Sequence, residues 1–589
     1  MSSPRFWSPT FEIERRDDGT ILMRQSEPLE DHFPTLADYL DHWADATPDR
    51  TWLARRQNGG NWVGVPYAEA RRAARRIGAA LLELGLGPER PLLILSENSL
   101  EHGLLGLACS WVGIPYAPVS PAYSLVSKDH GKLRDIAATL NPGAVFADDG
   151  AAFSTALDAI AAPGRVVLNA RHPVDGALLY DDLRSVSEAP AEAARAALTA
   201  ETVVKYLFTS GSTGSPKAVI NTNGMMTAMA AMTRDCYRFL EDEPPVVLDW
   251  APWNHTAAGN KVSSLVLTNG GTYYIDDGRP VPGKFDETIR NLREIACTWY
   301  FNVPLGYDML VEALETDEAL RDTFYSRLSM MFYAGAGMAQ HTWDRLIALG
   351  HEATGREVLL ATGLGSTETA PFALACTEPQ KKAGNVGVPS RGLTLKLVPA
   401  GGKLEARLKG PTMTPGYLDD PEKTAEVFDD EGFYCLGDAL KPVDPDDLAR
   451  GFYFDGRVAE NFKLSTGTWV TVGAVRGALV DALGGLARDA VIVGEDKPEL
   501  GALILLSEKA ANTPRSDVEA ALRERLAVAA AAASGSASRV RRMAILETPP
   551  SFDRGEVTEK GSLNQRAMRA HNVDLIETLY AGGPGIVAV

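Results

Sequence analysis

The segment Thr209 to Lys217, TSGSTGSPK, combines three kinds of group that bind polyanions. Its glycines let the backbone approach a phosphate closely, its hydroxyls and main-chain N–H groups donate hydrogen bonds, and Lys217 adds a positive charge. Pro216 and the β-prone run 218–220 show that the segment does not open a helix, as the common P-loop does. The pattern predicts a nucleotide-phosphate loop formed by Ser210, Gly211, Ser212, Thr213, Gly214 and Lys217; clusters of this composition also form plain surface turns.

A second loop, GLGSTET at 363–369, follows the apolar run 358–360 and supplies Thr367 and Glu368. Carboxylates are hard oxygen ligands for the Mg²⁺ that accompanies nucleotides, and a neighbouring hydroxyl can donate to a phosphate. A Thr-Glu pair that caps a helix has the same appearance. A ligand-binding role for this loop is favoured because the chain also contains the phosphate segment Thr209 to Lys217.

Three shorter patterns add groups suited to the rest of a nucleotide. YAGAG at 333–337 leaves room for a flat ring against the backbone, CLGD offers Asp438 to a ribose hydroxyl, and DGR offers Arg457. Taken singly, Asp438 is typical of a turn and Arg457 of a charged surface. Their joint presence favours a nucleotide site.

The bulk composition limits the classes of function. The chain has 589 residues, more than one hydrophobic core normally supports, so at least two domains are expected. Its 58 Lys and Arg against 77 Asp and Glu leave a net charge of −19, which argues against nucleic acid or an anionic membrane as the main partner. An anionic ligand must therefore be held by local groups.

The cysteines and the N-terminus indicate a cytoplasmic protein. The five cysteines are dispersed and lack metal-ligand spacing, so reduced thiols are expected. The N-terminus has no apolar signal-like region, and no run reaches the roughly 18 apolar residues that a spanning helix needs. We expect no membrane insertion.

The large N-terminal part shows alternating helix and strand patterns. Apolar positions at helical spacing predict a helix over 68–84 with Gly85 as its stop. The run 91–96 predicts a buried strand, with Ser96 capping a helix from Glu97. Further strands are expected at 166–168, 246–248, 273–275 and 358–360, so this part is predicted to be α/β.

A smaller unit follows. From about 401 the chain becomes turn-rich and acidic, and its last 130 or so residues alternate strands with a helix that Ser516 caps with Glu519. This favours an α+β domain. We place the boundary near 456–460, which gives a core domain over 1–456, a connecting segment over 457–460 and a C-terminal domain over 461–589.

In their order and separation, these motifs resemble the adenylate-forming superfamily of acyl-CoA synthetases, nonribosomal adenylation domains and luciferases. The resemblance covers nearly the whole chain and includes TSGSTGSPK, STE, GPTMTPGYLDDPEKT, YCLGD and DGRVAENFKL. The segments LDWAPWNHTAAGN, FKLSTGTWVTVGAVR and EVTEKGSLNQRA look most like the feruloyl-CoA synthetase branch.

The resemblance implies a role for each matching residue. The loop from Ser210 to Lys217 holds the β- and γ-phosphates of ATP, Thr367 contacts the α-phosphate, Glu368 binds Mg²⁺, and Asp438 with Arg457 holds the ribose. Gly335, Ala336 and Gly337 line the adenine and acyl side, and His255 stands at the gate between acyl pocket and thiol tunnel, although a structural histidine fits its local sequence equally well. Lys560 reaches the α-phosphate during adenylation, and the segment with Lys463 and Gly467 presents CoA.

Two departures from the family pattern bear on this assignment. Ala459 occupies the hinge position that is often Asp or Lys, which moves a polar hinge to Glu460 or makes it less polar. Ala257 and Ala258 stand where the branch tends to carry Phe and Gly. Loss of a substrate-facing Phe enlarges the acyl pocket.

The expected activity is that of an acid–thiol ligase. It uses ATP, Mg²⁺ and CoA to convert an aromatic, hydroxycinnamate-like acid into its CoA thioester through an acyl-adenylate. The alternatives are a freestanding adenylation enzyme that loads a carrier protein, a synthetase for another aromatic or aliphatic acid, and a non-catalytic binding homologue. A monomer or a homodimer is expected.

Overall fold

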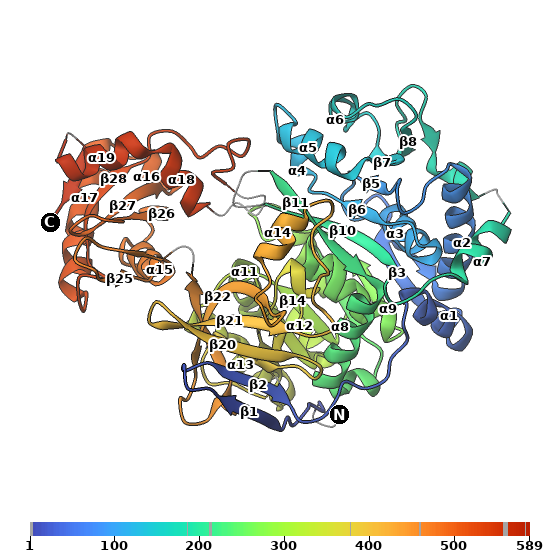
Figure 1. The fold of residues 1–589 in the computed structure, drawn as a ribbon, viewed down its shortest axis with the longest axis horizontal. Helices are drawn as coiled ribbons and strands as arrows, with labels where there is room; N and C mark the ends of the chain where they lie inside the picture. Colours follow the sequence, from blue (N-terminus) through green and yellow to red (C-terminus); the bar gives the residue numbers. More distant parts are fainter. Residues whose placement is uncertain are drawn as a thin grey trace.

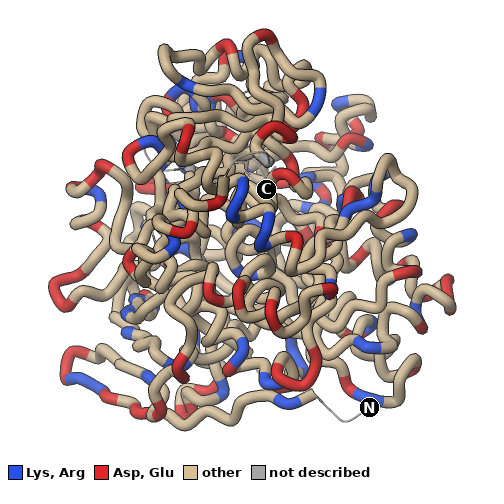
Figure 2. Tube along the Cα trace, turned by 90° about the vertical axis from the view of Figure 1, so that its right-hand side faces the viewer, with Lys and Arg blue, Asp and Glu red and all other residues tan. Residues whose placement is uncertain are grey.

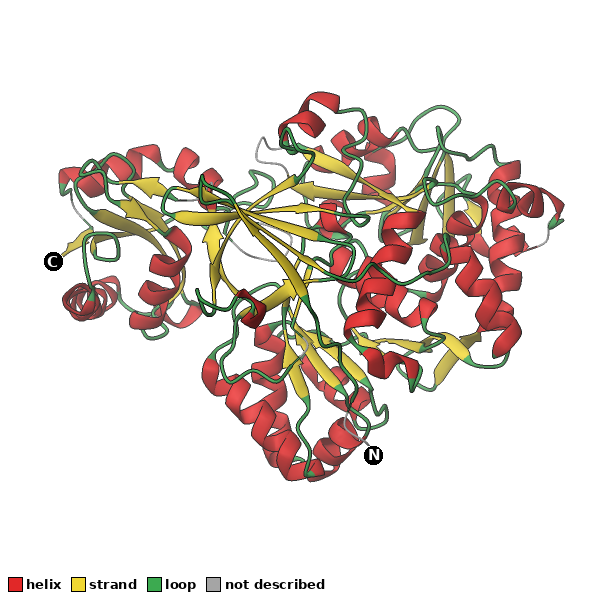
Figure 3. Cartoon of the chain, turned by 60° about the horizontal axis from the view of Figure 1, so that its bottom comes forward, coloured by secondary structure: helices red, strands yellow, loops and turns green. Residues whose placement is uncertain are grey.

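The computed structural model describes residues 4–184, 187–210, 215–376, 378–458, 461–557, 563–583 and 585–589. A large body carries the N-terminus and a smaller body carries the C-terminus (Figure 1). Both mix helices and strands (Figure 3). The predicted fold class, a large α/β domain followed by a small α+β domain, is confirmed.

The phosphate segment belongs to a largely parallel sheet. Its order is β11, β10, β6, β5, β7, β8, β9, and only β10 and β11 pair antiparallel. The strands are β5 (Leu92–Ile94), β6 (Tyr116–Pro118), β7 (Ala144–Asp149), β8 (Val166–Arg171), β9 (Leu178–Leu179), β10 (Val203–Ser210) and β11 (Pro216–Thr222). The antiparallel pair brings the two ends of the phosphate segment together, as Thr209 is registered with Lys217.

Two further sheets of the large domain are mostly or entirely parallel. One has the order β12 (Val246–Asp249), β13 (Thr272–Ile275), β3 (Thr51–Arg56), β4 (Trp62–Pro66), and the other β14 (Trp299–Asn302), β15 (Met330–Tyr333), β16 (Leu359–Ala361). Strands β12, β14, β15 and β16 are short and nearly fully buried, which is typical of parallel strands covered by helices.

Helices cover these sheets. The predicted helix over 68–84 is α2 (Tyr67–Glu83), and its apolar face, including Ala70, Ala74, Ile77 and Leu81, is fully buried. The other helices of the large domain used below are α3 (Leu100–Val112), α4 (Ala122–Leu125), α5 (Gly131–Leu140), α8 (Asn223–Cys236), the π-helix η3 (Ala257–Val262), α9 (Ser263–Thr268), the 3₁₀-helix η4 (Thr367–Thr369) and α14 (Pro421–Glu426).

A long antiparallel sheet carries the remaining nucleotide motifs. Its order is β1 (Phe11–Arg15), β2 (Ile21–Gln25), β20 (Thr394–Ala400), β21 (Lys403–Lys409), β22 (Tyr434–Pro442), β23 (Phe452–Arg457), β19 (Asn385–Pro389), β18 (Leu374–Ala375), β17 (Gly363–Leu364). Asp438 lies in β22 and Arg457 at the end of β23, so adjacent strands position these two residues.

The small domain has its own core. A hairpin of β24 (Phe462–Lys463) and β25 (Trp469–Val470) leads to α15 (Val472–Ala482). The sheet of this domain contains β26 (Ala487–Val493), β27 (Leu500–Leu506), β28 (Val540–Ile545) and β29 (Ile586–Ala588). The helices that cover it are α17 (Arg515–Ala532), α18 (Gln565–His571) and α19 (Val573–Ala581). Its buried apolar clusters contain only residues after 461, whereas those of the large domain end at Phe452.

The described residues show how charged residues and cysteines are distributed in the fold. Figure 2 shows Lys and Arg interspersed with Asp and Glu along the chain. All five cysteines are free thiols, four of them buried. No helix in the described ranges is long and apolar enough to cross a membrane.

Two predicted helix caps are wrong. Helix α3 starts at Leu100, and its cap is Ser99, whose Oγ accepts from the His102 N–H at 3.0 Å; the Ser96 hydroxyl instead donates to the Glu97 carbonyl. Helix α17 starts at Arg515 after Pro514, so Ser516 lies inside the helix and donates to the Asp517 carboxylate. In both cases the helix starts a few residues away from the predicted position, because neighbouring residues in the local sequence could serve equally well as the cap.

The cap at Ser99 yields a stability prediction. Replacing a Ser N-cap by Ala typically costs about 1 kcal/mol. We expect Ser99→Ala to lower the free energy of unfolding by about that amount in urea titrations. A Ser99→Ala variant as stable as wild type would contradict the assignment.

Candidate active site

Tyr417 joins the phosphate strands to the Thr-Glu loop. Its hydroxyl donates to Glu368 Oε1 at 3.0 Å, and Lys217 Nζ lies 5.3 Å from the centroid of its ring. Val219 and Tyr417 also form an antiparallel bridge, which anchors the 411–417 segment beside β11. A cation and a carboxylate thereby flank one aromatic ring.

The electrostatics of this trio follow from partial burial. Burial lowers the pKa of Lys217, and Lys423 on α14 lowers it further, while Glu368 acts in the opposite direction. Burial and the neighbouring Glu368 carboxylate raise the pKa of Tyr417, which keeps its hydroxyl protonated as a donor. Lys217 is thus a cation whose charge is only partly balanced by protein groups, a suitable partner for phosphate oxygens.

The Thr-Glu loop is held by its backbone. Glu368 lies in η4, and its carbonyl accepts from the Thr414 N–H at 2.8 Å, while Thr414 Oγ1 donates to the Ile220 carbonyl in β11. Thr367 and Glu368 remain partly exposed at the surface of this junction. Their side chains are therefore available to a ligand while the backbone beneath them is held in place.

A magnesium ion bound with ATP would fit this arrangement. Mg²⁺ is usually held by one or two carboxylates together with phosphate oxygens and water. In the described part of the chain no cluster of three or more His, Cys, Asp and Glu side chains could hold a metal. Glu368, with one oxygen bonded to Tyr417, provides a single carboxylate, which suits an ion brought by the nucleotide.

The predicted ribose residues lie together. Arg457 Nε is 2.9 Å from Asp438 Oδ1, and Asp438 is buried while the Arg457 side chain is largely exposed. This pair comes from strand register, since Asp438 and Arg457 face each other in β22 and β23. Arg457 therefore holds the buried Asp438 carboxylate in place as a hydrogen-bond acceptor.

The segment after β15 has an exposed backbone. Gly335, Ala336 and Gly337 are exposed, and Gly335 has φ +92°, which favours glycine. Beneath them, the Thr362 hydroxyl donates to the Tyr333 carbonyl at 2.8 Å and links β15 to the Thr-Glu loop. The loops after β15 and β16 therefore share one edge of the sheet.

His255 directly precedes an unusual helix, whose N-cap is Thr256. His255 is partly buried, its carbonyl accepts from the Gly259 N–H, and residues 257–262 form a π-helix. π-Helical turns occur often at functional sites because they redirect side chains and free carbonyl oxygens. Here the Gly259 carbonyl accepts from Lys205 Nζ and from the Ser263 hydroxyl.

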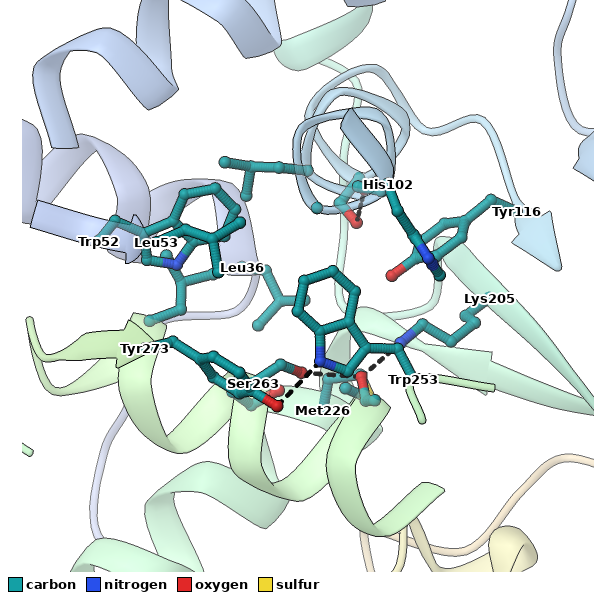
Figure 4. Close-up of a pocket in the computed structure, with 17 residues that line it drawn as sticks. Leu36, Trp52, Leu53, His102, Tyr116, Lys205, Met226, Trp253, Ser263 and Tyr273 are labelled. Atoms are coloured by element: carbon teal, nitrogen blue, oxygen red, sulfur yellow. Dashed lines mark hydrogen bonds between the residues drawn. The ribbon is translucent and has the colours of Figure 1, made fainter. Parts of the chain in front are cut away.

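A cavity of about 80 Å³ is lined in part by Trp253 (Figure 4). Trp253 and Tyr273 form part of its wall and share a hydrogen bond of 3.0 Å, and the Tyr273 hydroxyl donates to buried Asp249. Gly335 to Gly337 and Thr367 are not among the residues that line it. The cavity is therefore a space separate from the one those residues border.

Lys205 reaches this cavity from β10 (Figure 4). Its ammonium donates to the Gly259 carbonyl at 2.6 Å and to Asn260 Oδ1 at 3.0 Å. Burial lowers its pKa to about 7. Lys205 thus fixes the strand of the phosphate segment to the π-helix, an interaction that the sequence did not indicate.

The small-domain residues lie elsewhere. Gly467 forms the tip of the β24–β25 hairpin with φ +81°, and Lys463 Nζ lies 5.0 Å from the Trp469 ring. That ring packs on Gly401 in the turn between β20 and β21, where an added Cβ would approach Trp469 within 3.1 Å. No contact within the described ranges brings Lys463 or Gly467 to Glu368.

Lys560 itself, like Gly211 to Gly214, lies outside the described residues, but the segment before it contacts the large domain. The Asp553 carboxylate accepts from the Ser127 hydroxyl at 2.7 Å, and Lys132 Nζ donates to the Phe552 carbonyl at 3.2 Å. Lys132 Nζ also lies 4.8 Å from the Phe552 ring centroid. Residues 552 and 553 are thereby docked between α4 and α5.

Models of known families match both parts of the chain. The one described as AMP-binding enzyme matches residues 40–418, and the one described as AMP-binding enzyme C-terminal domain matches 463–583. The chain belongs to the AMP-binding enzyme family.

Individual relatives of this AMP-binding enzyme are distant. It is 27% identical to 4-coumarate-CoA ligase 1 of Narcissus pseudonarcissus, over 65% of this chain and 69% of that one, and 27% identical to a feruloyl-CoA synthase of Amycolatopsis sp, over 65% and 72%. The ATP-bound crystal structure of MatB from Rhodopseudomonas palustris has the same fold, with a TM-score of 0.69 at 21% identity over 92% and 99% of the two chains.

Sequence reasoning missed Tyr417 and Lys205. Tyr417 lies in the segment GPTMTPGYLDDPEKT that supported the resemblance, so the motif was visible while its contact with Glu368 was not. Lys205 carried no signal, because a lysine in a strand pattern normally faces solvent.

The Tyr417 hydroxyl gives a binding prediction. A hydrogen bond to a charged group contributes about 1.5 kcal/mol or more, so Tyr417→Phe is expected to weaken MgATP binding about tenfold. Isothermal titration calorimetry measures this directly. Tyr453→Phe is the control, since its hydroxyl makes no hydrogen bond among the described residues; equal affinities of Tyr417→Phe and wild type would contradict the prediction.

Buried Lys205 gives a pH prediction. Its pKa is near 7 in the folded protein and about 10.4 when unfolded. Between these values the unfolded chain binds more protons, so this lysine makes stability rise with pH by up to about 1.4 kcal/mol per unit. Relative to wild type, Lys205→Met should lose that rise between pH 7 and 10 in urea titrations.

The exposed Lys441→Met is the control for this experiment. It should leave the pH dependence of unfolding as in wild type. Parallel pH profiles for wild type and Lys205→Met would show that Lys205 is not a buried cation in the folded protein.

Proposed function

We propose that this AMP-binding enzyme is an AMP-forming ligase that converts a carboxylic acid into its CoA thioester through an acyl-adenylate. The arrangement of Lys217, Tyr417 and Glu368 carries the proposal, because it joins a cation for phosphate to a carboxylate for Mg²⁺. The proposed acid is aromatic and hydroxycinnamate-like. The names of the plant relative, a 4-coumarate-CoA ligase, and of the bacterial relative, a feruloyl-CoA synthase, support that choice.

The first half-reaction needs no nucleophilic side chain. A carboxylate oxygen of the acid attacks the α-phosphorus of ATP, the bond to the β-phosphate oxygen breaks, and pyrophosphate leaves. Lys217 and the 210–214 loop hold the β- and γ-phosphates, Thr367 contacts the α-phosphate, and Asp438 with Arg457 orients the ribose. When bound, Mg²⁺ on Glu368 would neutralise charge on the phosphates.

The adenine and the acid lie beside the open glycine segment in this proposal. Gly335, Ala336 and Gly337 border both, and His255 separates the acyl pocket from the route of the thiol. In the second half-reaction the CoA sulfur attacks the acyl carbon, and AMP leaves. Positioning and electrostatic stabilisation supply the catalysis in both halves.

One site serves both halves if the small domain rotates about residues 457–460. In the first arrangement Lys560 stabilises charge on the α-phosphoryl oxygens. In the second, Lys560 withdraws and the hairpin with Lys463 and Gly467 presents CoA. Separate cores on the two sides of this segment support such a rotation.

The activity itself is tested by CoA-dependent release of AMP. Hydroxycinnamic, benzoic and medium-chain acids are supplied with MgATP, with and without CoA. AMP and acyl-CoA formed together support the ligase. Adenylation without transfer to CoA would favour loading of a carrier protein, and absence of ATP–pyrophosphate exchange with every acid would favour a binding homologue.

The division of labour predicts separable effects at Lys560. Lys560→Ala should slow adenylation by roughly 10²- to 10³-fold, the loss typical of one preorganised charge-stabilising donor. Thioester formation from premade acyl-AMP should be largely retained. Lys509→Ala on the exposed surface of the same domain is the control, and equal losses in both half-reactions would contradict the assignment.

A further inference from the structure

Two lysines beside the π-helix are buried in different ways. Lys205 and Lys261 are each 4% exposed, and burial lowers the pKa of both to about 7. The Lys205 ammonium has two oxygen acceptors. No hydrogen bond or ion pair holds the Lys261 ammonium within the part of the chain that the structure describes; it lies 3.7 Å from the Phe332 ring centroid and 4.5 Å from that of Phe372.

Two aromatic faces do not replace oxygen acceptors for an ammonium. Cation–π attraction offsets part of the cost of removing the charge from water, but the three N–H donors still lack acceptors. Buried polar groups are almost always hydrogen-bonded, and exceptions are often explained by a ligand. The Lys261 ammonium lacks an acceptor in the described part of the chain, but its Nζ is not fully enclosed, so a ligand oxygen can reach it.

The position of Lys261 relates it to the elements around the proposed acid site. Its own helix follows His255, Phe332 lies in β15 just before the 335–337 segment, and Phe372 follows η4 with its Glu368. An added Cβ on Gly363, at the start of the Thr-Glu loop, would lie 3.5 Å from Phe332 Cζ. The helix after His255, the strand before the 335–337 segment and the segment after η4 therefore converge on this ammonium, and the first two of them border the acid in the proposed function.

We propose that Lys261 is a specificity-determining residue that binds an acidic oxygen at the far end of the substrate acid. This inference rests on the proposed function and names its substrate class: acids that carry a phenolic or second carboxylic oxygen remote from the carboxylate that is adenylated. The oxygen completes the coordination of the ammonium, and the two phenyl rings enclose the apolar part of the acid next to it.

Matched pairs of acids test this assignment. 4-Hydroxycinnamate is compared with cinnamate, and pentanedioate with pentanoate, by the ratio of kcat/KM for AMP formation. A charge-assisted hydrogen bond predicts that wild type prefers the oxygen-bearing member of at least one pair about tenfold or more. The pair that shows the preference distinguishes a phenol from a second carboxylate.

Lys261→Met removes the charge and keeps a flexible side chain of similar length. The preference should fall to about one, while the rate with the acid that lacks the distal oxygen stays within about threefold of wild type. Lys205→Met is the matched control, because that lysine is equally buried but already satisfied; it should retain the preference. If Lys261→Met fails to fold, Lys261→Gln provides the same comparison.

A binding measurement separates this inference from the activity. Each acid is titrated into wild type and Lys261→Met without ATP, and the shift in melting temperature is recorded. Tighter binding of the oxygen-bearing acid to wild type alone supports Lys261 even if no CoA thioester forms. A wild-type enzyme that treats both members of both pairs alike, or a Lys261→Met variant that keeps the preference, overturns the proposal.

Discussion

The hydrogen bond from Tyr417 to Glu368 is the interaction on which the site depends. It connects segments that are about 50 residues apart in the chain, and the ring that donates it also lies against Lys217. Thr414 supports the same junction through the carbonyls of Glu368 and Ile220. A cation and a carboxylate can therefore approach one ligand without collapsing onto each other, because the phenol ring stands between them.

The sheets of the large domain explain why this junction forms. Strand β11 carries Lys217 at one sheet edge, and the connection between β17 and β18 carries Glu368 in the nine-stranded antiparallel sheet, so neither sheet alone contains the site. The 411–417 segment crosses between them and bridges to Val219. The same antiparallel sheet also positions Asp438 and Arg457 through strand register.

The π-helix after His255 concentrates buried charge beside the site. Lys205 reaches it from the phosphate strand, and Lys261 projects from it toward Phe332 and Phe372. Buried cations are costly, and a fold retains them where they order backbone groups or meet a ligand. Lys205 orders backbone and side-chain oxygens of the π-helix. The Lys261 ammonium lies against two aromatic rings, and this contrast supports the substrate class inferred for the acid.

The sequence by itself determined the fold class, several buried strands of the large domain and the family. Strands such as β8, β12 and β13 were predictable because continuous apolar runs of that length are typical of buried parallel strands. The phosphate, Thr-Glu, LGD and DGR motifs were also visible, since glycines, hydroxyls and charges at these spacings have few other uses together. The roles of Lys560, His255 and the 457–460 hinge stay predictions.

Only the tertiary structure decided which groups meet. The caps at Ser99 and Pro514 depended on where the packed chain enters each helix, which local sequence does not specify. Tyr417 on Glu368, Lys205 on Gly259 and Lys261 between two phenyl rings are contacts between residues distant in the chain. Residue type indicates what a side chain can do, but burial and partners, which set its charge and its freedom, arise only when the sheets and helices pack.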